Sequence, residues 1–216
     1  MIYYRILDRL NQNEVIRYEA PGAEYQYAFG EERWVRSDIM AAYDGRRGQY
    51  EEIPAEQAAA LLEQQRILYQ ELLLLADRFA EKAHEGQVDK GGNPYIGHPR
   101  AVAASLTNTE YKIIALLHDI CEDTPYTTDD LLNMGFTFRI VNSVRLLTKT
   151  PLLTEEAYWR RLRSDSGARA VKIADLTHNS DLSRIPHPTE KDYARVEKYR
   201  RALAFLQDAA QNKNAE

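Results

Sequence analysis

Apolar residues recur at helical spacing from Pro54 onward, and this periodicity constrains the fold more than any other feature of the chain. Pro54 suits the start of a helix, where its missing N–H costs nothing, and Gly86 suits the end of that helix. Thr189 and Asp192 resemble a capping box that opens a last helix. The pattern predicts an all-α body, a helical bundle, over residues 54–211. Further short helices are predicted for HPRAVAASL, YKIIALLHDICED, TDDLLNM, FRIVNSVRLLTK, TEEAYWRRLR and SGARAVKIADLTHN.

Residues 1–53 have a different character. Short tyrosine-rich runs, IYYRIL, EVIRYEA and YQYAF, are separated by Asn, Pro and Gly. Aromatic residues favour strands and the intervening residues favour turns, so this part is expected to form short strands or hairpins. The chain is therefore divided into a small β-containing N-terminal extension, residues 1–53, and a helical domain, residues 54–211.

Composition limits the classes of protein to which the chain can belong. Its 216 residues, 44% of them hydrophobic, are enough for a core without disulfides, and the single cysteine, Cys121, suits a reducing compartment. No stretch resembles a membrane span or a signal peptide, so we expect a cytoplasmic protein with no membrane partner. A net charge of −5 argues against nucleic-acid binding, which normally requires a basic surface. A phosphorylated small molecule stays compatible, because a few local cations and a metal ion can bind it.

Four ionisable residues lie close together in the segment ALLHDICED, namely His118, Asp119, Glu122 and Asp123. In one continuous helix, residues three and four apart share a face, so these side chains would form a single polar patch. The ordinary alternative is a solvated helix end. However, two acids at a helix C-terminus face the negative end of the helix dipole, and the rest of this helix is strongly apolar. A bound divalent cation would resolve both problems, and we therefore favour a metal site.

Other segments must supply further ligands. His98 precedes a proline at a predicted helix start, and Asp175 lies in an apolar run. Each residue alone has an ordinary interpretation, as a turn histidine or a salt-bridged acid. Together with His118 and Asp119 they supply nitrogen and oxygen ligands, which suit Mn²⁺, Fe²⁺ or Zn²⁺ better than Ca²⁺. His178, three residues beyond Asp175, is expected to have a structural role beside the site.

The order His98, then His118-Asp119, then Asp175 resembles the metal signature of the HD superfamily of phosphohydrolases. The strings GNPYIGHP, ALLHDICEDT, LTK and VKIAD with a following HN resemble the hydrolase domain of the RelA/SpoT homologues. Those enzymes act on (p)ppGpp, the alarmone of the stringent response. The resemblance covers residues 70–206 and implies an HD-type fold for the helical domain, whereas it leaves the N-terminal extension unexplained.

The resemblance also implies roles for individual residues. Glu122 and Asp123 would act on the attacking water as general base and orienting group. Asn179 and Lys90 would contact the substrate. Apart from the resemblance, Lys172 lies one turn before Asp175 on the same helix face and could meet a phosphate group. The family reaction removes pyrophosphate from the 3′ position and returns GDP or GTP. The ligands of a single Mn²⁺ ion would be His98, His118, Asp119 and Asp175.

Two segments depart from the family pattern. Asp89 stands where the family usually has an arginine that packs against the guanine base, and Leu176 and Asp181 stand where arginines are frequent. An aspartate cannot stack on a base in that way, and it would repel phosphates that it faced. The residues for catalysis therefore match the family better than the residues for base recognition.

We expect a Mn²⁺-dependent hydrolase that removes the 3′-pyrophosphate from (p)ppGpp or a related nucleotide. One alternative is an HD phosphatase that acts on another nucleotide, such as a nucleoside monophosphate. The other is a catalytically silent HD module that binds a nucleotide or a protein. The presence of both Glu122 and Asp123 counts against the silent module, because binding alone does not require an acid pair. Formation of a homo-oligomer is left open.

Overall fold

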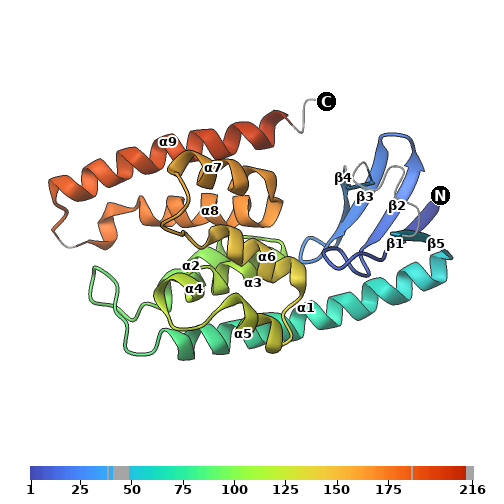
Figure 1. Cartoon of the computed structure of the whole chain (residues 1–216), viewed down its shortest axis with the longest axis horizontal. Helices are drawn as coiled ribbons and strands as arrows, with labels where there is room; N and C mark the ends of the chain where they lie inside the picture. The colour runs from blue at the N-terminus through green and yellow to red at the C-terminus, as the bar shows by residue number, and fades with distance from the viewer. Residues whose placement is uncertain (38, 41–48, 186, 213–216) are drawn as a thin grey trace. The chain divides into compact units, whose positions relative to one another are not determined.

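The computed structural model describes residues 1–37, 39–40, 49–185 and 187–212. The chain forms two compact units, residues 1–72 and 73–216 (Figure 1). The first unit contains a five-stranded antiparallel sheet with strand order β4-β3-β2-β1-β5. The strands are β1 (Ile2–Ile6), β2 (Val15–Ala20), β3 (Ala23–Ala28), β4 (Arg33–Ser37) and β5 (Tyr50–Ile53).

A Pro-Gly turn joins β2 to β3. Pro21 has the fixed φ that the second position of a tight turn requires, and Gly22 has a φ of 75°, which is accessible to glycine at little cost. The two flanking alanines, Ala20 and Ala23, face each other across the hairpin. The turn residues that separate the tyrosine-rich runs thus define the hairpin.

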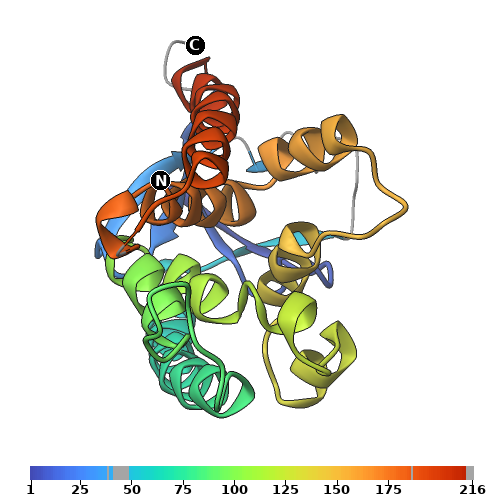
Figure 2. The same ribbon diagram turned by 90° about the vertical axis from the view of Figure 1, so that its left-hand side faces the viewer.

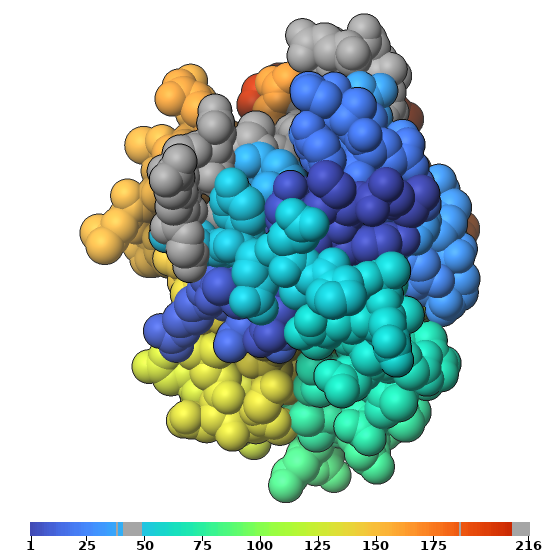
Figure 3. Space-filling view, turned by 90° about the vertical axis from the view of Figure 1, so that its right-hand side faces the viewer, coloured from blue at the N-terminus to red at the C-terminus, as the bar shows by residue number. Residues whose placement is uncertain are grey.

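The sheet and the first turns of α1 (Ala55–Ala83) share a hydrophobic core. Val15 and Ile53 pack with Ala58 of α1, and Trp34 and Leu61 contact this cluster. Figure 3 shows the strands in blue beside the cyan start of α1. The expected strands are therefore present. The description of the whole chain as all-α is only roughly right, because its first unit is built on a sheet.

The second unit is helical, as the periodicity predicts. It contains the later turns of α1, and Figure 2 shows two of its longer helices, α8 and α9, side by side. The other elements are α2 (Gly97–Ala104), α3 (Thr109–Leu117), α4 (Ile120–Asp123), α5 (Thr128–Asn133), α6 (Phe138–Leu147), α7 (Glu155–Ser164), α8 (Ser166–Asn179), the 3₁₀ helix η2 (Leu182–Arg184) and α9 (Glu190–Asn212).

Helix α3 forms the centre of this unit. Ile113, Ile114 and Leu117 have no exposed surface, so the helix is apolar on several faces at once. Gly167, in the first turn of α8, allows α8 to approach closely. A Cβ atom at that position would lie 2.8 Å from Cδ1 of Ile114 and 3.2 Å from Oγ of Ser143 on α6. The close packing of α3 and α8 brings the polar residues near their ends together.

One local expectation is wrong. The segment predicted as one helix is divided into α3 and α4, and His118 and Asp119 lie between them. Asp119 has a φ of −98° and a ψ of −7°, away from regular helix values. The carbonyl group of Asp119 accepts hydrogen bonds from the backbone N–H groups of Glu122 and Asp123, which starts the short helix α4. The four ionisable residues are therefore brought together by a turn and not by a shared helix face.

The last helix begins as predicted. The carboxylate of Asp192 accepts hydrogen bonds from the backbone N–H and the hydroxyl group of Thr189, at 3.0 and 2.7 Å. This contact satisfies a backbone donor just before α9. Within the described part of the chain, none of the helices combines the length and apolarity that crossing a membrane requires.

Candidate active site

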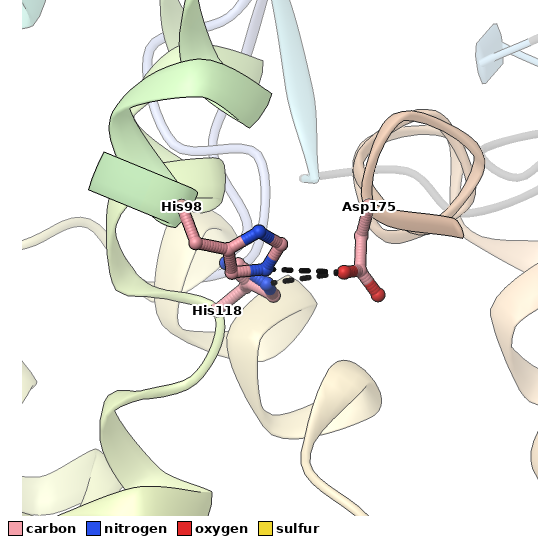
Figure 4. Close-up of side chains that lie close together, drawn as sticks. All are labelled: His98, His118 and Asp175. Carbon is pink, nitrogen blue, oxygen red and sulfur yellow. Dashed lines mark ion pairs between the residues drawn. The ribbon is translucent and has the colours of Figure 1, made fainter. Parts of the chain in front are cut away.

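Three elements of the second unit bring the predicted metal ligands together. His98 lies in the first turn of α2, His118 and Asp119 lie in the turn between α3 and α4, and Asp175 lies in the last turns of α8. Figure 4 shows both imidazole rings directed at the carboxylate of Asp175. His98 and Asp175 are 77 positions apart in the sequence, but their side chains meet in the fold.

The three side chains are close enough to share one cation. One ligand atom from each of His98, His118 and Asp175 lies within 4.8 Å of the others. Nε2 of His98 is 3.2 Å from Oδ1 of Asp175, and Nε2 of His118 is 3.8 Å from the same oxygen. All three residues are buried, with exposed fractions of 5%, 3% and 4%. Two imidazole nitrogens and a carboxylate oxygen in a buried cluster form a donor set for a divalent transition metal.

The orientation of His118 leaves one nitrogen for a ligand. Its Nδ1 is 2.6 Å from the carbonyl oxygen of Ala115, so Nδ1 carries the hydrogen and Nε2 carries a lone pair in the neutral ring. Nε2 is buried, and no other described residue makes a hydrogen bond to it. Burial opposes the charged ring, but Asp119 and Asp175 outweigh it and raise the pKa of His118 to about 10. The cluster thus attracts positive charge, from a proton or from a metal ion.

Asp119 lies beside this cluster. Its Oδ2 is 3.1 Å from Nε2 of His118 and 3.6 Å from Nε2 of His98. The same oxygen accepts a hydrogen bond of 2.5 Å from the hydroxyl group of Tyr95. Burial alone would raise the pKa of Asp119, but His118 and the Tyr95 hydroxyl hold it below its usual value. Asp119 is therefore an ionised carboxylate next to both imidazole rings.

Two predicted substrate contacts instead bind the carboxylate of Asp175 in this structure. Nζ of Lys172 donates to Oδ2 at 2.6 Å, and Nδ2 of Asn179 donates to Oδ1 at 2.5 Å. Burial would raise the pKa of Asp175, but Lys172 and the two imidazoles hold it well below its usual range. These contacts orient the carboxylate toward the histidines.

A pocket of about 530 Å³ opens beside the cluster. Glu122 lines it, and Oε2 of Glu122 accepts a hydrogen bond from the backbone N–H of Lys149 at 3.1 Å. Asp123 lies close by, with Oδ2 3.5 Å from the Tyr95 hydroxyl. Burial and the negative charges of Asp119 and Glu122 raise the pKa of Asp123. Four cationic side chains also line the pocket: Lys149, Lys172, Arg195 and Lys198.

Lys90 is placed elsewhere. Its Nζ forms an ion pair of 3.0 Å with Asp192 at the start of α9, and the described lining of the pocket does not include Lys90. Its neighbour Asp89 is bound by Arg184 through an ion pair of 3.1 Å. The aspartate at this departure from the family pattern is therefore neutralised by an arginine from a distant part of the chain.

Sequence reasoning missed Tyr95 and Arg184. Tyr95 belongs to the string GNPYIGHP and precedes His98 by three residues, so its place in a string already matched to the family was a usable signal. Arg184 had no comparable signal, because its contacts with Asp89 and His178 depend on how η2 packs.

Comparisons with known proteins find relatives that are named as pyrophosphohydrolases. The chain is 39% identical over 114 residues to the guanosine-3′,5′-bis(diphosphate) 3′-pyrophosphohydrolase of Haemophilus influenzae, a match that covers 46% of this chain and 17% of that protein. It is 37% identical over 144 residues to the human guanosine-3′,5′-bis(diphosphate) 3′-pyrophosphohydrolase MESH1, covering 59% of this chain and 78% of that protein. The mouse MESH1 protein is 36% identical, with the same coverage of both chains. The chain thus spans less than a fifth of the bacterial relative and most of the mammalian ones.

A comparison with solved structures finds a similar fold. A solved structure of a metazoan orthologue of SpoT, described as hydrolysing ppGpp, matches 64% of this chain and 84% of its own with a TM-score of 0.52. The sequence identity of 24% means that this match concerns the fold alone. No family model matches the chain.

Proposed function

Because the chain belongs to the family of guanosine-3′,5′-bis(diphosphate) 3′-pyrophosphohydrolases, we propose that it removes the 3′-pyrophosphate from (p)ppGpp with the help of a divalent metal ion. The observation that carries this proposal is the convergence of His98, His118 and Asp175 at the edge of a pocket of nucleotide size. Nε2 of His118 lies 3.1 Å from Oδ2 of Asp119 and 3.8 Å from Oδ1 of Asp175, and this supports a metal ion, because carboxylates in such a cluster are costly to bury without a positive charge beside them.

We assign the metal ligands to His98, His118, Asp119 and Asp175. The mixed nitrogen and oxygen donors suit Mn²⁺, and also Fe²⁺ or Zn²⁺. When bound, such an ion offsets phosphate charge and lowers the pKa of a coordinated water. Lys172 and Asn179 hold the carboxylate of Asp175 in the orientation that the imidazoles face.

The acid pair acts on the attacking water. Glu122 lines the same pocket as His118 and Asp119, and this supports the assignment of its carboxylate as the base that takes the proton of the water, with Asp123 as the orienting group. Water adds to the phosphorus attached to the 3′ oxygen, the bond between that oxygen and phosphorus breaks, and the 3′ oxygen gains a proton. Pyrophosphate leaves with two phosphates, and the 5′ phosphates stay on the nucleoside.

The cationic lining fits a substrate with many phosphates. Lys172 and Asn179 line the pocket, so they can contact phosphate oxygens as well as Asp175. Lys90 would first have to leave Asp192, and its substrate role stays a prediction. Asp89 does not repel the substrate as a free charge would, because Arg184 pairs with it.

The test is product analysis with Mn²⁺-loaded protein. We expect pyrophosphate from ppGpp and no product from GMP, GDP, GTP or other ordinary nucleotides. Glu122→Gln should retain Mn²⁺ binding and lower the rate by about 10²- to 10⁴-fold. Asp119→Ala serves as the blank. Release of orthophosphate from a nucleoside monophosphate would establish the phosphatase instead, and a Glu122→Gln variant as active as the wild type would exclude the proposed base.

A further inference from the structure

A chain of side chains leads from a partly exposed arginine to the metal cluster. Nη1 of Arg184 lies 2.9 Å from Nδ1 of His178, and Nδ1 of His178 lies 2.8 Å from Nδ1 of His98. His98 then faces Asp175 through its other nitrogen, Nε2, at 3.2 Å. The nitrogen of His178 is therefore shared between Arg184 and a predicted metal ligand.

The chemistry of the three groups decides which nitrogen carries each hydrogen. The guanidinium of Arg184 is always protonated and can only donate, so Nδ1 of His178 must accept. The hydrogen between the two imidazoles then belongs to Nδ1 of His98. A neutral imidazole has a single N–H group, so Nε2 of His98 carries a lone pair toward the cluster. This is the form of the ring that binds a metal ion.

Without Arg184, the opposite placement of the hydrogens on His98 and His178 would be favoured. In the protein without a metal ion, the carboxylate of Asp175 attracts an N–H group on Nε2 of His98, because an ionised carboxylate is a strong acceptor. The hydrogen between the rings would then move to Nδ1 of His178, and Nε2 of His98 would no longer have a free lone pair. Arg184 prevents this, because an N–H group on Nδ1 of His178 would point at the N–H donor on Nη1 of Arg184.

The structure holds Arg184 firmly in place. Nη2 of Arg184 donates to Oδ2 of Asp89 at 3.1 Å, and Oδ1 of Asp89 accepts two backbone hydrogen bonds, from Gly91 and Asn93, each at 2.9 Å. A Cβ atom on Gly91 would lie 2.9 Å from the carbonyl oxygen of Arg184, so the missing side chain lets the two loops pack closely. Asp89 and Gly91 thus anchor the arginine.

We infer that Arg184 is a positioning residue that, through His178, fixes the hydrogen of His98 on Nδ1 and keeps Nε2 available for the metal ion. The inference rests on the metal site of the proposed function. It also assigns a structural role to Asp89, which anchors Arg184. The hydrogen positions can be observed without any hydrolysis assay.

The experiment is long-range ¹H–¹⁵N NMR on protein with ¹⁵N-labelled histidines, of which the chain has five. In the wild type without metal we expect Nδ1 of His178 to be unprotonated and Nδ1 of His98 to be protonated. In Arg184→Met we expect the hydrogen to move to His178, and Mn²⁺ affinity, measured by calorimetry, to fall by about 10- to 100-fold. Arg200→Met, which removes an exposed arginine from α9, is the matched control and should change neither.

Two substitutions of His178 separate positioning from simple packing. His178→Asn keeps an oxygen acceptor near the position of Nδ1, so Mn²⁺ affinity should stay close to that of the wild type. His178→Leu removes the acceptor and should lose about 10- to 100-fold. Equal losses in both variants would overturn the inference.

The NMR result also distinguishes this inference from the proposed function. A protonated Nδ1 of His178 in the wild type, or an Arg184→Met spectrum like that of the wild type, would overturn the inference whatever the substrate. A wild type that binds Mn²⁺ but does not hydrolyse ppGpp would refute the proposed substrate and leave the role of Arg184 intact.

Discussion

The hydroxyl group of Tyr95 donates a hydrogen bond of 2.5 Å to Oδ2 of Asp119, the carboxylate that lies beside both imidazole rings of the cluster. Partners that orient a metal ligand in this way are commonly worth about 10- to 100-fold in affinity. We expect Tyr95→Phe to weaken Mn²⁺ binding by about that factor, measured by isothermal titration calorimetry. Tyr193→Phe, at a tyrosine that is 54% exposed, should bind as the wild type does. Unchanged affinity in Tyr95→Phe would show that Asp119 needs no such support.

Removal of the metal ion should lower the stability of the second unit. A ligand that binds only the folded state at 100 times its Kd stabilises that state by about 2.7 kcal/mol, which corresponds to roughly 5–10 °C in Tm for a domain of this size. We therefore expect Mn²⁺ to raise Tm by this amount over chelator-treated protein in a calorimetric scan. Asp175→Asn should abolish the shift, and an equal shift in that variant would place the ion elsewhere.

The pair of Asp77 and Arg100 predicts a pH dependence of stability. Arg100 donates to both carboxylate oxygens, at 2.7 and 2.8 Å, and this holds the pKa of Asp77 below its usual value. A lowered carboxyl pKa adds stability above the unfolded-state value of about 4, and this stability is lost as the pH falls through the folded-state pKa.

We therefore expect Asp77→Asn to lower the free energy of unfolding near neutral pH by about 1 kcal/mol or less, since both side chains are 39% exposed. The difference from the wild type should shrink as the pH falls below about 4, in urea unfolding curves recorded along a pH series. A difference that is constant across the series would contradict the assignment to this ion pair.

The close approach of α8 to α3 predicts a cost for a larger residue at Gly167. A Cβ atom there would lie 2.8 Å from Ile114, which has no exposed surface and little space to move. Gly167→Ala should lower the free energy of unfolding by about 1–3 kcal/mol, measured by urea denaturation. Gly97→Ala is the control, because nothing lies within 4 Å of its Cβ position, and it should be neutral or slightly stabilising. Equal effects of the two substitutions would show that packing at Gly167 is not tight.

Local pattern was sufficient to predict much of the fold. The helices after Pro54, the tyrosine-rich strands and the start of α9 at Thr189 follow from periodicity and capping, which depend on residues a few positions apart. The order of His98, His118-Asp119 and Asp175 could also be recognised before their contacts were known. Local pattern failed at the turn between α3 and α4, where residues with helical spacing are divided by a break at His118 and Asp119.

The support around the site could not be predicted, because it depends on contacts between distant segments. Lys90 binds Asp192, 102 residues away, and Asp89 binds Arg184, 95 residues away. Neither partner can be chosen from periodicity, since several acids and arginines occur in the same stretches of sequence. Helix propensity acts through neighbouring residues, whereas these pairs form only after α8, η2 and α9 have packed. The order of the predicted ligands is therefore visible in the sequence, but the side chains that contact them were selected by the tertiary fold.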